Sequence, residues 1–312
     1  MTRAALLFPG QGSQHVGMAS ELFDARPDLL GENADEVLGW SLRDLVLDGP
    51  EEQLTRTEHA QPALFAVSYA LWDVLGSRWD AEIVGAAGHS LGEFTALCAA
   101  GAFTFEDGLK VVARRGQAMA EAADARPSGM AALIGADEEL AESIARQRRE
   151  EGGSLQVANI NAPGQIVVAG SAEDIAWLTD RGSELGVRRI IPLKVAGAFH
   201  STFMEPAADQ VAAALEEVTL TEPAFPVWSN TTARPHRRDE IASLLRSQVV
   251  STVRFSESLE GLAAQGADTF VHVGPGDVTA GMAKRTVEGA TTHVVSDLGD
   301  VEIVVSALGT MT

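Results

Sequence analysis

Cysteine is nearly absent from this chain of 312 residues, and Cys98 is its one representative. A lone thiol cannot close a disulfide within the chain, so nothing in the sequence calls for an oxidising compartment. Cys98 lies in an alanine-rich segment that is typical of a helix, which predicts the role of a small, buried, apolar side chain.

Long apolar runs are also missing. No stretch approaches the roughly 18 residues that a helix needs to cross a bilayer. The N-terminal "MTRAALLFPG" has too short an apolar core before Pro9 to act as a signal peptide. The sequence therefore predicts a soluble, cytoplasmic protein that has no membrane partner.

Basic residues are scarce relative to acidic ones, with 23 Lys and Arg against 44 Asp and Glu and a formal net charge of −21. Such an excess opposes binding to nucleic acid and to anionic membranes, and we expect neither as a partner. The 46% hydrophobic content is, by contrast, enough for a large core. We expect one large domain, or one that carries a smaller insert.

Strand-like and helix-like segments alternate along the chain, which predicts a mostly parallel sheet with helices on both faces. The expected strands are 3–8, 82–88, 225–229, 268–273 and 292–296. The clearest expected helices are 60–75, 91–100, 105–123, 203–217, 239–248 and 256–265.

Residues 129–196 break this alternation. Their order is strand, helix, two strands about the turn "NAPG", helix and strand, which is the βαββαβ order of a ferredoxin-like unit. We therefore expect a ferredoxin-like small subdomain over 128–196, inserted into a large α/β subdomain made of 1–127 and 197–312. Binding sites often lie in the cleft between two such parts.

The segment "GAAGHSLGEF" (85–94) places Ser90 between two glycines. Gly-x-Ser-x-Gly between a buried strand and a helix predicts a sharp bend that lifts the serine hydroxyl clear of the sheet, where it can act as a nucleophile. The apolar run before the motif and the alanine-rich segment after it supply the strand and the helix that such a bend needs.

A second glycine-rich turn, "FPGQGSQHVGM", follows the first expected strand. It fits neither the GxGxxG nor the GxxxxGK[ST] pattern, so nucleotide binding has weak support. Backbone N–H groups at the carboxyl edge of a parallel sheet can instead bind an oxyanion. The N–H of Gln11, with that of Leu91 directly after the expected nucleophile, would form such a hole.

A serine nucleophile needs a base, and His200 is favoured among the seven histidines. The segment "KVAGAFHS" carries it off a strand through small residues, at the point where the expected insert ends. A structural or solvent-facing role is expected for His15, His59, His89, His236, His272 and His293. No Asp or Glu lies in an obvious position for the third group of a triad, so a backbone or amide carbonyl is expected to orient the imidazole.

Seven segments occur in the order found in malonyl-CoA:acyl carrier protein transacylases, and the chain resembles that family over nearly its whole length. They are "FPGQGSQ", "GHSLGE", "RRGQAM", "NAPGQIVVAG", "VAGAFHS", "SQVVSTVRFSESL" and "VGPG". The resemblance implies a hydrolase-like core with a ferredoxin-like insert. It also implies these site residues: Ser90 as nucleophile, His200 as base, Gln11 and Leu91 as oxyanion hole, Arg115 as carboxylate clamp, and Gln248 as the residue whose carbonyl steadies His200.

Arg114 and Arg115 are adjacent on an expected helix, so they face about 100° apart and only one can point into a cleft. The resemblance implies that this is Arg115. Two charge-assisted hydrogen bonds to a carboxylate, each worth about 1.5 to 3 kcal/mol, would favour malonyl over acetyl by about 10² to 10⁴ fold. The segment "GAFH", with the bulky Phe199, resembles the same segment in malonyl-selective members of the family.

The implied reaction is a ping-pong transfer from malonyl-CoA to the phosphopantetheine thiol of acyl carrier protein, without a metal or a bound cofactor. It would supply extender units for fatty-acid or polyketide synthesis. Carrier proteins of this type are acidic, so we expect a local basic rim, with candidates at 188–194, 234–238 and 284–285. The alternative is an acyl-thioester hydrolase on the same fold. A patatin-like Ser-Asp enzyme and a silent carrier-docking protein have less support.

Two positions depart from the family pattern. His272 stands where the family commonly has a carboxylate, and Thr202 stands where a proline often opens a helix. Neither belongs to the implied chemistry, so we expect local differences in packing.

Overall fold

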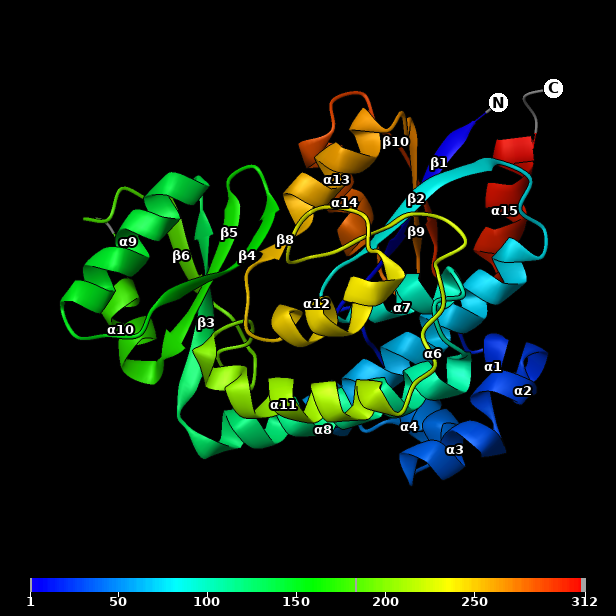
Figure 1. Cartoon of the computed structure of the whole chain (residues 1–312), viewed down its shortest axis with the longest axis horizontal. Helices are drawn as coiled ribbons and strands as arrows, with labels where there is room; N and C mark the ends of the chain where they lie inside the picture. The colour runs from blue at the N-terminus through cyan, green and yellow to red at the C-terminus, as the bar shows by residue number, and fades with distance from the viewer. Residues whose placement is uncertain (1, 183, 310–312) are drawn as a thin grey trace.

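The computed structural model describes residues 2–182 and 184–309, and its strands form two sheets (Figure 1). The first sheet has the strand order β10-β9-β1-β2-β7, and each neighbouring pair is parallel. Its strands are β1 (Arg3–Phe8), β2 (Glu82–Gly88), β7 (Val227–Trp228), β9 (Thr269–Val273) and β10 (Thr291–Val295).

Helices connect the strands of this sheet and extend beyond it. They are α1 (Leu22–Ala25), α2 (Pro27–Leu30), α3 (Glu32–Leu38), α4 (Leu42–Asp48), α5 (Glu51–Thr55), α6 (Thr57–Gly76), α7 (Leu91–Ala99), α8 (Phe105–Ala125), α11 (Glu205–Glu216), α12 (Ile241–Gln248), α13 (Phe255–Ala264), α14 (Val278–Thr286) and α15 (Leu298–Gly309). Among the described residues, no helix is both long enough and apolar enough to cross a bilayer.

The parallel sheet is covered on both faces. Successive side chains of a strand point to opposite sides, so Leu6 and Phe8 of β1 pack in one cluster, with residues of α6 and α7. Ala5 and Leu7 pack in a second cluster, with residues of α13 and α14. Helices on both faces of a parallel sheet are what the alternating sequence pattern predicted, so that prediction is confirmed.

The second sheet has the order β6-β3-β5-β4-β8. Four of its strands pair antiparallel, and α9 (Glu138–Glu150) and α10 (Ala172–Arg181) complete the predicted βαββαβ order. These strands are β3 (Ser128–Ile134), β4 (Gln156–Ala162), β5 (Gln165–Ser171) and β6 (Arg189–Pro192). They form a separate lobe, drawn in green in Figure 1.

The fifth strand of this sheet comes from a later part of the chain. β8 (Val253–Arg254) pairs parallel with β4, and the sequence did not predict it. Two residues are too few to show a period, so only the tertiary pairing defines this strand. The subdomain boundaries at residues 128 and 196 stay a prediction.

The sequence also failed to predict several helices, namely α1 to α5, α14 and α15. The helices α1 to α5 have between four and seven residues each, which is too short for a helical period to stand out from its surroundings. The strand expected at 225–229 is reduced to Val227–Trp228, where the chain pairs with β2.

Candidate active site

The turn between β2 and α7 holds Ser90 in a strained backbone conformation, with φ 52° and ψ −103°. A Cβ added to Gly88 would lie 1.8 Å from the carbonyl carbon of Gly92. A Cβ added to Gly92 would lie 2.2 Å from the carbonyl oxygen of Phe8. Glycine is therefore required on both sides of the serine, because the two backbones pass in contact. The sharp bend predicted from the sequence is present.

His200 lies directly beside this serine. Its Nε2 is 2.8 Å from Ser90 Oγ, and its Nδ1 is 2.8 Å from the backbone oxygen of Gln248. When Nδ1–H donates to that carbonyl, Nε2 is left free to accept the serine proton. A backbone carbonyl thus occupies the place that a carboxylate has in a Ser-His-Asp triad, as the lack of a suitable acid in the sequence predicted.

The imidazole of His200 is buried, and this sets its protonation. Burial, together with the nearby charge of Arg115, lowers the pKa of His200 from 6.5 to about 3. The ring is therefore neutral at neutral pH, which is the state that a general base needs.

Arg115 reaches the same hydroxyl from α8, where its side chain is 1% exposed. Its Nη2 donates to Ser90 Oγ at 3.0 Å and to Gln248 Oε1 at 2.9 Å, and its Nη1 donates to Gln61 Oε1 at 2.6 Å. None of these acceptors is a carboxylate, and Nε has no partner in the described part of the chain. Burial lowers the pKa of Arg115 to about 10, while the charge of Glu93 raises it. The guanidinium is charged at neutral pH but has no directly bonded anion.

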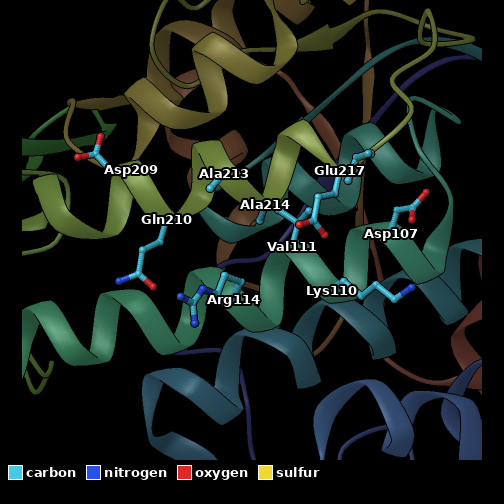
Figure 2. Close-up of a pocket in the computed structure, with 10 residues that line it drawn as sticks. Asp107, Lys110, Val111, Arg114, Asp209, Gln210, Ala213, Ala214 and Glu217 are labelled. Carbon is cyan, nitrogen blue, oxygen red and sulfur yellow. The ribbon is translucent and has the colours of Figure 1, made fainter.

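Arg114, the preceding residue on α8, faces the other way. It is exposed and lines a groove of about 620 Å³ on the outside of α8 and α11 (Figure 2). The prediction that only one arginine of the pair points into the cleft is confirmed.

A cavity of about 310 Å³ is lined by Ser90, His200 and Arg115. Gln11, Leu91 and the buried Phe199 also line it, whereas Gln248 lies beneath it. The opposite wall comes from the second sheet and includes Met130, Asn159, Asn161 and Val167. The cavity therefore lies between the two sheets, and each site residue expected from the sequence lies at it or directly below it.

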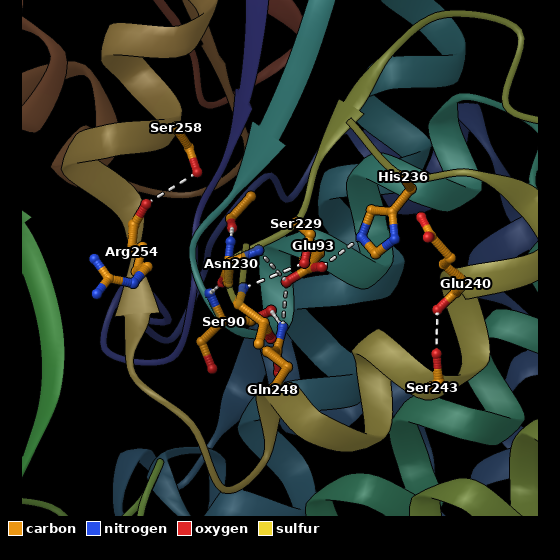
Figure 3. Close-up of polar contacts among 12 residues, drawn as sticks. Ser90, Glu93, Ser229, Asn230, His236, Glu240, Ser243, Gln248, Arg254 and Ser258 are labelled. Carbon is orange, nitrogen blue, oxygen red and sulfur yellow. Dashed lines mark hydrogen bonds and ion pairs between the residues drawn. The ribbon is translucent and has the colours of Figure 1, made fainter. Parts of the chain in front are cut away.

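A buried polar network that was not predicted from the sequence lies below Ser90 (Figure 3). Asn230 Oδ1 accepts a hydrogen bond from Ser90 N–H at 2.8 Å. Glu93 Oε1 lies 2.6 Å from His236 Nε2, and both side chains are fully buried. A carboxylate in the otherwise apolar helix "LGEFTALCA" was a signal that could have revealed Glu93. His236 gave no signal, because it lies in the polar segment "RPHRR" and only the fold buries it.

The two positions that depart from the family pattern have local roles. His272 is buried, its Nδ1 lies 2.6 Å from Thr279 Oγ1, and burial lowers its pKa to about 4. The N–H of Thr202 donates to Gln156 Oε1 at 3.0 Å, which a proline could not do. Both interactions are matters of packing and backbone support, as expected.

Residues 5–306 of the chain match the family model of the acyl transferase domain. The malonyl CoA-acyl carrier protein transacylase of Bacillus subtilis (strain 168) is 40% identical over 313 residues, which cover 99% of this chain and 98% of the relative. The solved acyl-carrier-protein-S-malonyltransferase from Bartonella henselae is 38% identical, with a TM-score of 0.93 over 99% of this chain and 100% of that one. A malonyl-transacylase solved in complex with its type II PKS acyl-carrier protein is 34% identical, with a TM-score of 0.92 over 98% of this chain and 100% of the matched chain. The chain therefore belongs to the acyl transferase domain family, among its malonyl-CoA:acyl carrier protein transacylases.

Proposed function

We propose that this protein transfers the malonyl group of malonyl-CoA to the phosphopantetheine thiol of an acyl carrier protein, as the names of its relatives indicate. The product would extend chains in fatty-acid or polyketide synthesis. The observation that carries the proposal is that one hydroxyl, Ser90 Oγ, lies 2.8 Å from the imidazole of His200 and 3.0 Å from the guanidinium of Arg115.

In the first half-reaction, Ser90 Oγ attacks the thioester carbonyl while its proton passes to His200 Nε2. The N–H groups of Gln11 and Leu91 stabilise the oxyanion that forms. The C–S bond then breaks, the proton passes from His200 to the CoA sulfur, and the malonyl group remains on Ser90 as an ester. The Gln248 carbonyl holds Nδ1–H throughout, so the base keeps its orientation.

In the second half-reaction, the phosphopantetheine thiol gives its proton to His200 and attacks the ester carbonyl. The serine oxygen leaves with that proton, and the malonyl group is then a thioester of the carrier. The nucleophile and the base both come from the chain, so no proposed step calls for a metal or a bound cofactor.

We assign the choice of a carboxylated acyl group to Arg115. The oxygens that accept hydrogen bonds from its guanidinium belong to neutral side chains. The malonyl carboxylate would therefore be the first anion to bind the guanidinium directly. Two charge-assisted hydrogen bonds would favour malonyl over acetyl by about 10² to 10⁴ fold. Phe199 would limit the volume beside the acyl chain, where one methylene more or less is worth about 1 to 3 kcal/mol.

An acidic carrier needs cations near the cavity mouth, since the enzyme as a whole is acidic. Lys194 lines the cavity, and α14, which also contributes to the lining, ends with Lys284 and Arg285. These side chains are exposed and form no ion pair within the described ranges. In the segment 234–238, by contrast, Arg237 pairs with Asp239. We therefore favour 188–194 and 284–285 as the docking rim, beside a cleft bounded by the proposed small subdomain 128–196.

Intact-mass measurement tests the proposal. The protein is incubated with malonyl-CoA alone, and a phosphopantetheinylated carrier protein or buffer is then added. We expect a malonyl adduct that Ser90→Ala lacks, that persists in buffer and that moves to the carrier. Failure of the wild-type protein to form the adduct would overturn the proposal.

The alternative of an acyl-thioester hydrolase is not supported, because the matched relatives are transacylases. A carboxylate clamp is also of no use to an enzyme that clears assorted acyl groups. The same experiment separates the two activities, because rapid loss of the adduct to water would indicate hydrolysis. A cytoplasmic location stays a prediction from the sequence.

A further inference from the structure

Glu93 is a buried carboxylate that the proposed reaction does not use. It lies in the first turn of α7, three residues after Ser90, and is 0% exposed. Its Oε1 lies 2.6 Å from His236 Nε2, and its Oε2 accepts from Asn230 N–H at 3.1 Å and from Gln248 Nε2 at 2.8 Å (Figure 3). Within the described residues it makes no hydrogen bond to the serine hydroxyl, to the imidazole of His200 or to the guanidinium.

His236 acts as the support of this carboxylate. Its Nδ1 has no hydrogen-bond partner among the described residues, so within them the contact at Nε2 is the one hydrogen bond of the imidazole ring. With its proton on Nε2, His236 donates a hydrogen bond to Glu93 Oε1. Glu93 Oε2 then accepts from two groups on the side of the active site, the backbone N–H of Asn230 and the side-chain amide of Gln248.

The first of these groups is Asn230, which spans the elbow. Its Oδ1 accepts from Ser90 N–H and its Nδ2 donates to the backbone oxygen of Gly88, each at 2.8 Å. Asn230 therefore holds the two peptide groups that flank His89, directly before Ser90, whose φ is 52°. Because Glu93 accepts from the backbone N–H of Asn230, the carboxylate fixes the backbone from which the Asn230 side chain extends to the elbow.

The second group is the side-chain amide of Gln248. Its Nε2 donates to Glu93 Oε2 and to the backbone oxygen of Ser90 at 2.7 Å, so both of its hydrogens are used. A carboxylate only accepts, so it turns the NH₂ toward itself and the amide oxygen toward Arg115, which donates to that oxygen at 2.9 Å. The backbone oxygen of the same residue holds His200.

We propose that Glu93 is a positioning residue for the acyl transfer, which fixes Asn230 and Gln248 and through them the nucleophile, the base and the carboxylate-binding guanidinium. The charge of Glu93 adds to this role, because it raises the pKa of Arg115 against the effect of burial. The proposal rests on the proposed function, since the guanidinium matters only to an enzyme that selects a carboxylated acyl group.

Glu93→Gln is the sharpest test, since it keeps the size of the side chain and replaces an acceptor by an amide. If the new amide turns its NH₂ toward Gln248, two donors meet, and Gln248 flips to present its own NH₂ to Arg115. Misplacing a reacting group by about 1 Å can cost about 10² in rate. We therefore expect kcat/KM for malonyl transfer to fall by about 10²-fold and that for acetyl transfer to fall less, by about 10-fold.

Asp174→Asn is the matched control. Asp174 is also 0% exposed, but it bonds Arg148, Ser154 and Ser171 beside the second sheet. We expect this variant to melt at a lower temperature while its malonyl-to-acetyl ratio stays that of the wild type. All rates are expressed per active serine, counted with a neutral serine-directed fluorophosphonate, so that a loss of folded protein does not mimic a loss of positioning.

The outcomes separate the two proposals. If the wild-type protein forms no malonyl ester, the proposed function fails. If it does, but Glu93→Gln keeps the wild-type ratio and the wild-type rate of fluorophosphonate labelling, the positioning role fails and the function stands. Should Glu93→Gln not fold, His236→Leu removes the support of the same carboxylate. A smaller shift of the ratio in the same direction supports the proposal, and a folded His236→Leu with wild-type kinetics overturns it.

Discussion

The regions around the two sheets each bury a carboxylate, but for different ends. Beside the second sheet, Asp174 accepts from Arg148 Nε of α9 at 2.6 Å and caps the start of α10, so it joins these two helices. Below the elbow of the parallel sheet, Glu93 leads through Gln248 to a cavity that holds a nucleophile and a base. The difference teaches that a buried charge does not by itself mark a functional site. Its connection to a cavity does.

The parallel-sheet region depends most on Ser90. Replacing it by alanine removes the oxygen that forms the ester, and we expect malonyl transfer to fall by about 10⁶-fold. Intact mass should show no adduct, while the melting temperature stays close to that of the wild type. A malonyl adduct at another residue of Ser90→Ala would contradict the assignment of the nucleophile.

Arg115 sets the next largest effect. We expect Arg115→Ala to lower kcat/KM for malonyl transfer by about 10² to 10⁴ fold, while acetyl transfer holds or rises because no carboxylate is needed. Arg114→Ala is the control, since that side chain lies in the outer groove, and it should keep wild-type kinetics. An equal fall of kcat/KM for malonyl and acetyl transfer in Arg115→Ala would show that Arg115 does not select the carboxylate.

Acid should slow the nucleophile only well below neutral pH. The base works when neutral, and burial followed by the charge of Arg115 lowers the pKa of His200 to about 3, so the rate falls as pH drops through that value. Loss of the cation raises the pKa, so Arg115→Ala should move the acid limb to higher pH. The rate of fluorophosphonate labelling, measured from about pH 2.5 to 8 so that the range includes the wild-type limb, tests this. If the acid limb of the pH–rate profile does not move in Arg115→Ala, the guanidinium charge does not affect the pKa of His200.

The same titration affects stability. The unfolded imidazole titrates near 6.5 and the folded one near 3, so between these values unfolding takes up a proton. The contribution of His200 to stability is therefore undiminished above about pH 6.5 and declines as the pH falls through that window.

Replacing Asp174 should have the smallest effect on malonyl transfer, in contrast to replacing Glu93. We expect Asp174→Asn to lower the free energy of unfolding by about 1 to 3 kcal/mol, because the buried donors around it lose their charged acceptor. Urea denaturation measures the loss, and malonyl transfer at a permissive temperature should be unchanged. A selective loss of malonyl over acetyl transfer in this variant would remove the distinction between the two regions.

Much of the site could be predicted from the sequence because its motifs are local. Gly88, Ser90 and Gly92 fall within five residues, and their spacing alone requires the bend. The partners of Ser90 are distant, at 110 residues for His200 and 158 for Gln248, so spacing could favour the first, and only family resemblance could assign the second. Glu93 and His236 lie 143 residues apart, and nothing in their local sequence links them.

By itself, the sequence determined the parallel sheet, the βαββαβ order of the second sheet and the elbow, because strand and helix periods and tight turns are set by neighbouring residues. Only the tertiary structure decided that β8 joins the second sheet and that His236 is buried on Glu93. It also turned the Gln248 amide toward Arg115. Such pairings depend on which distant groups meet where water is excluded, and a buried polar group must find its partner in three dimensions.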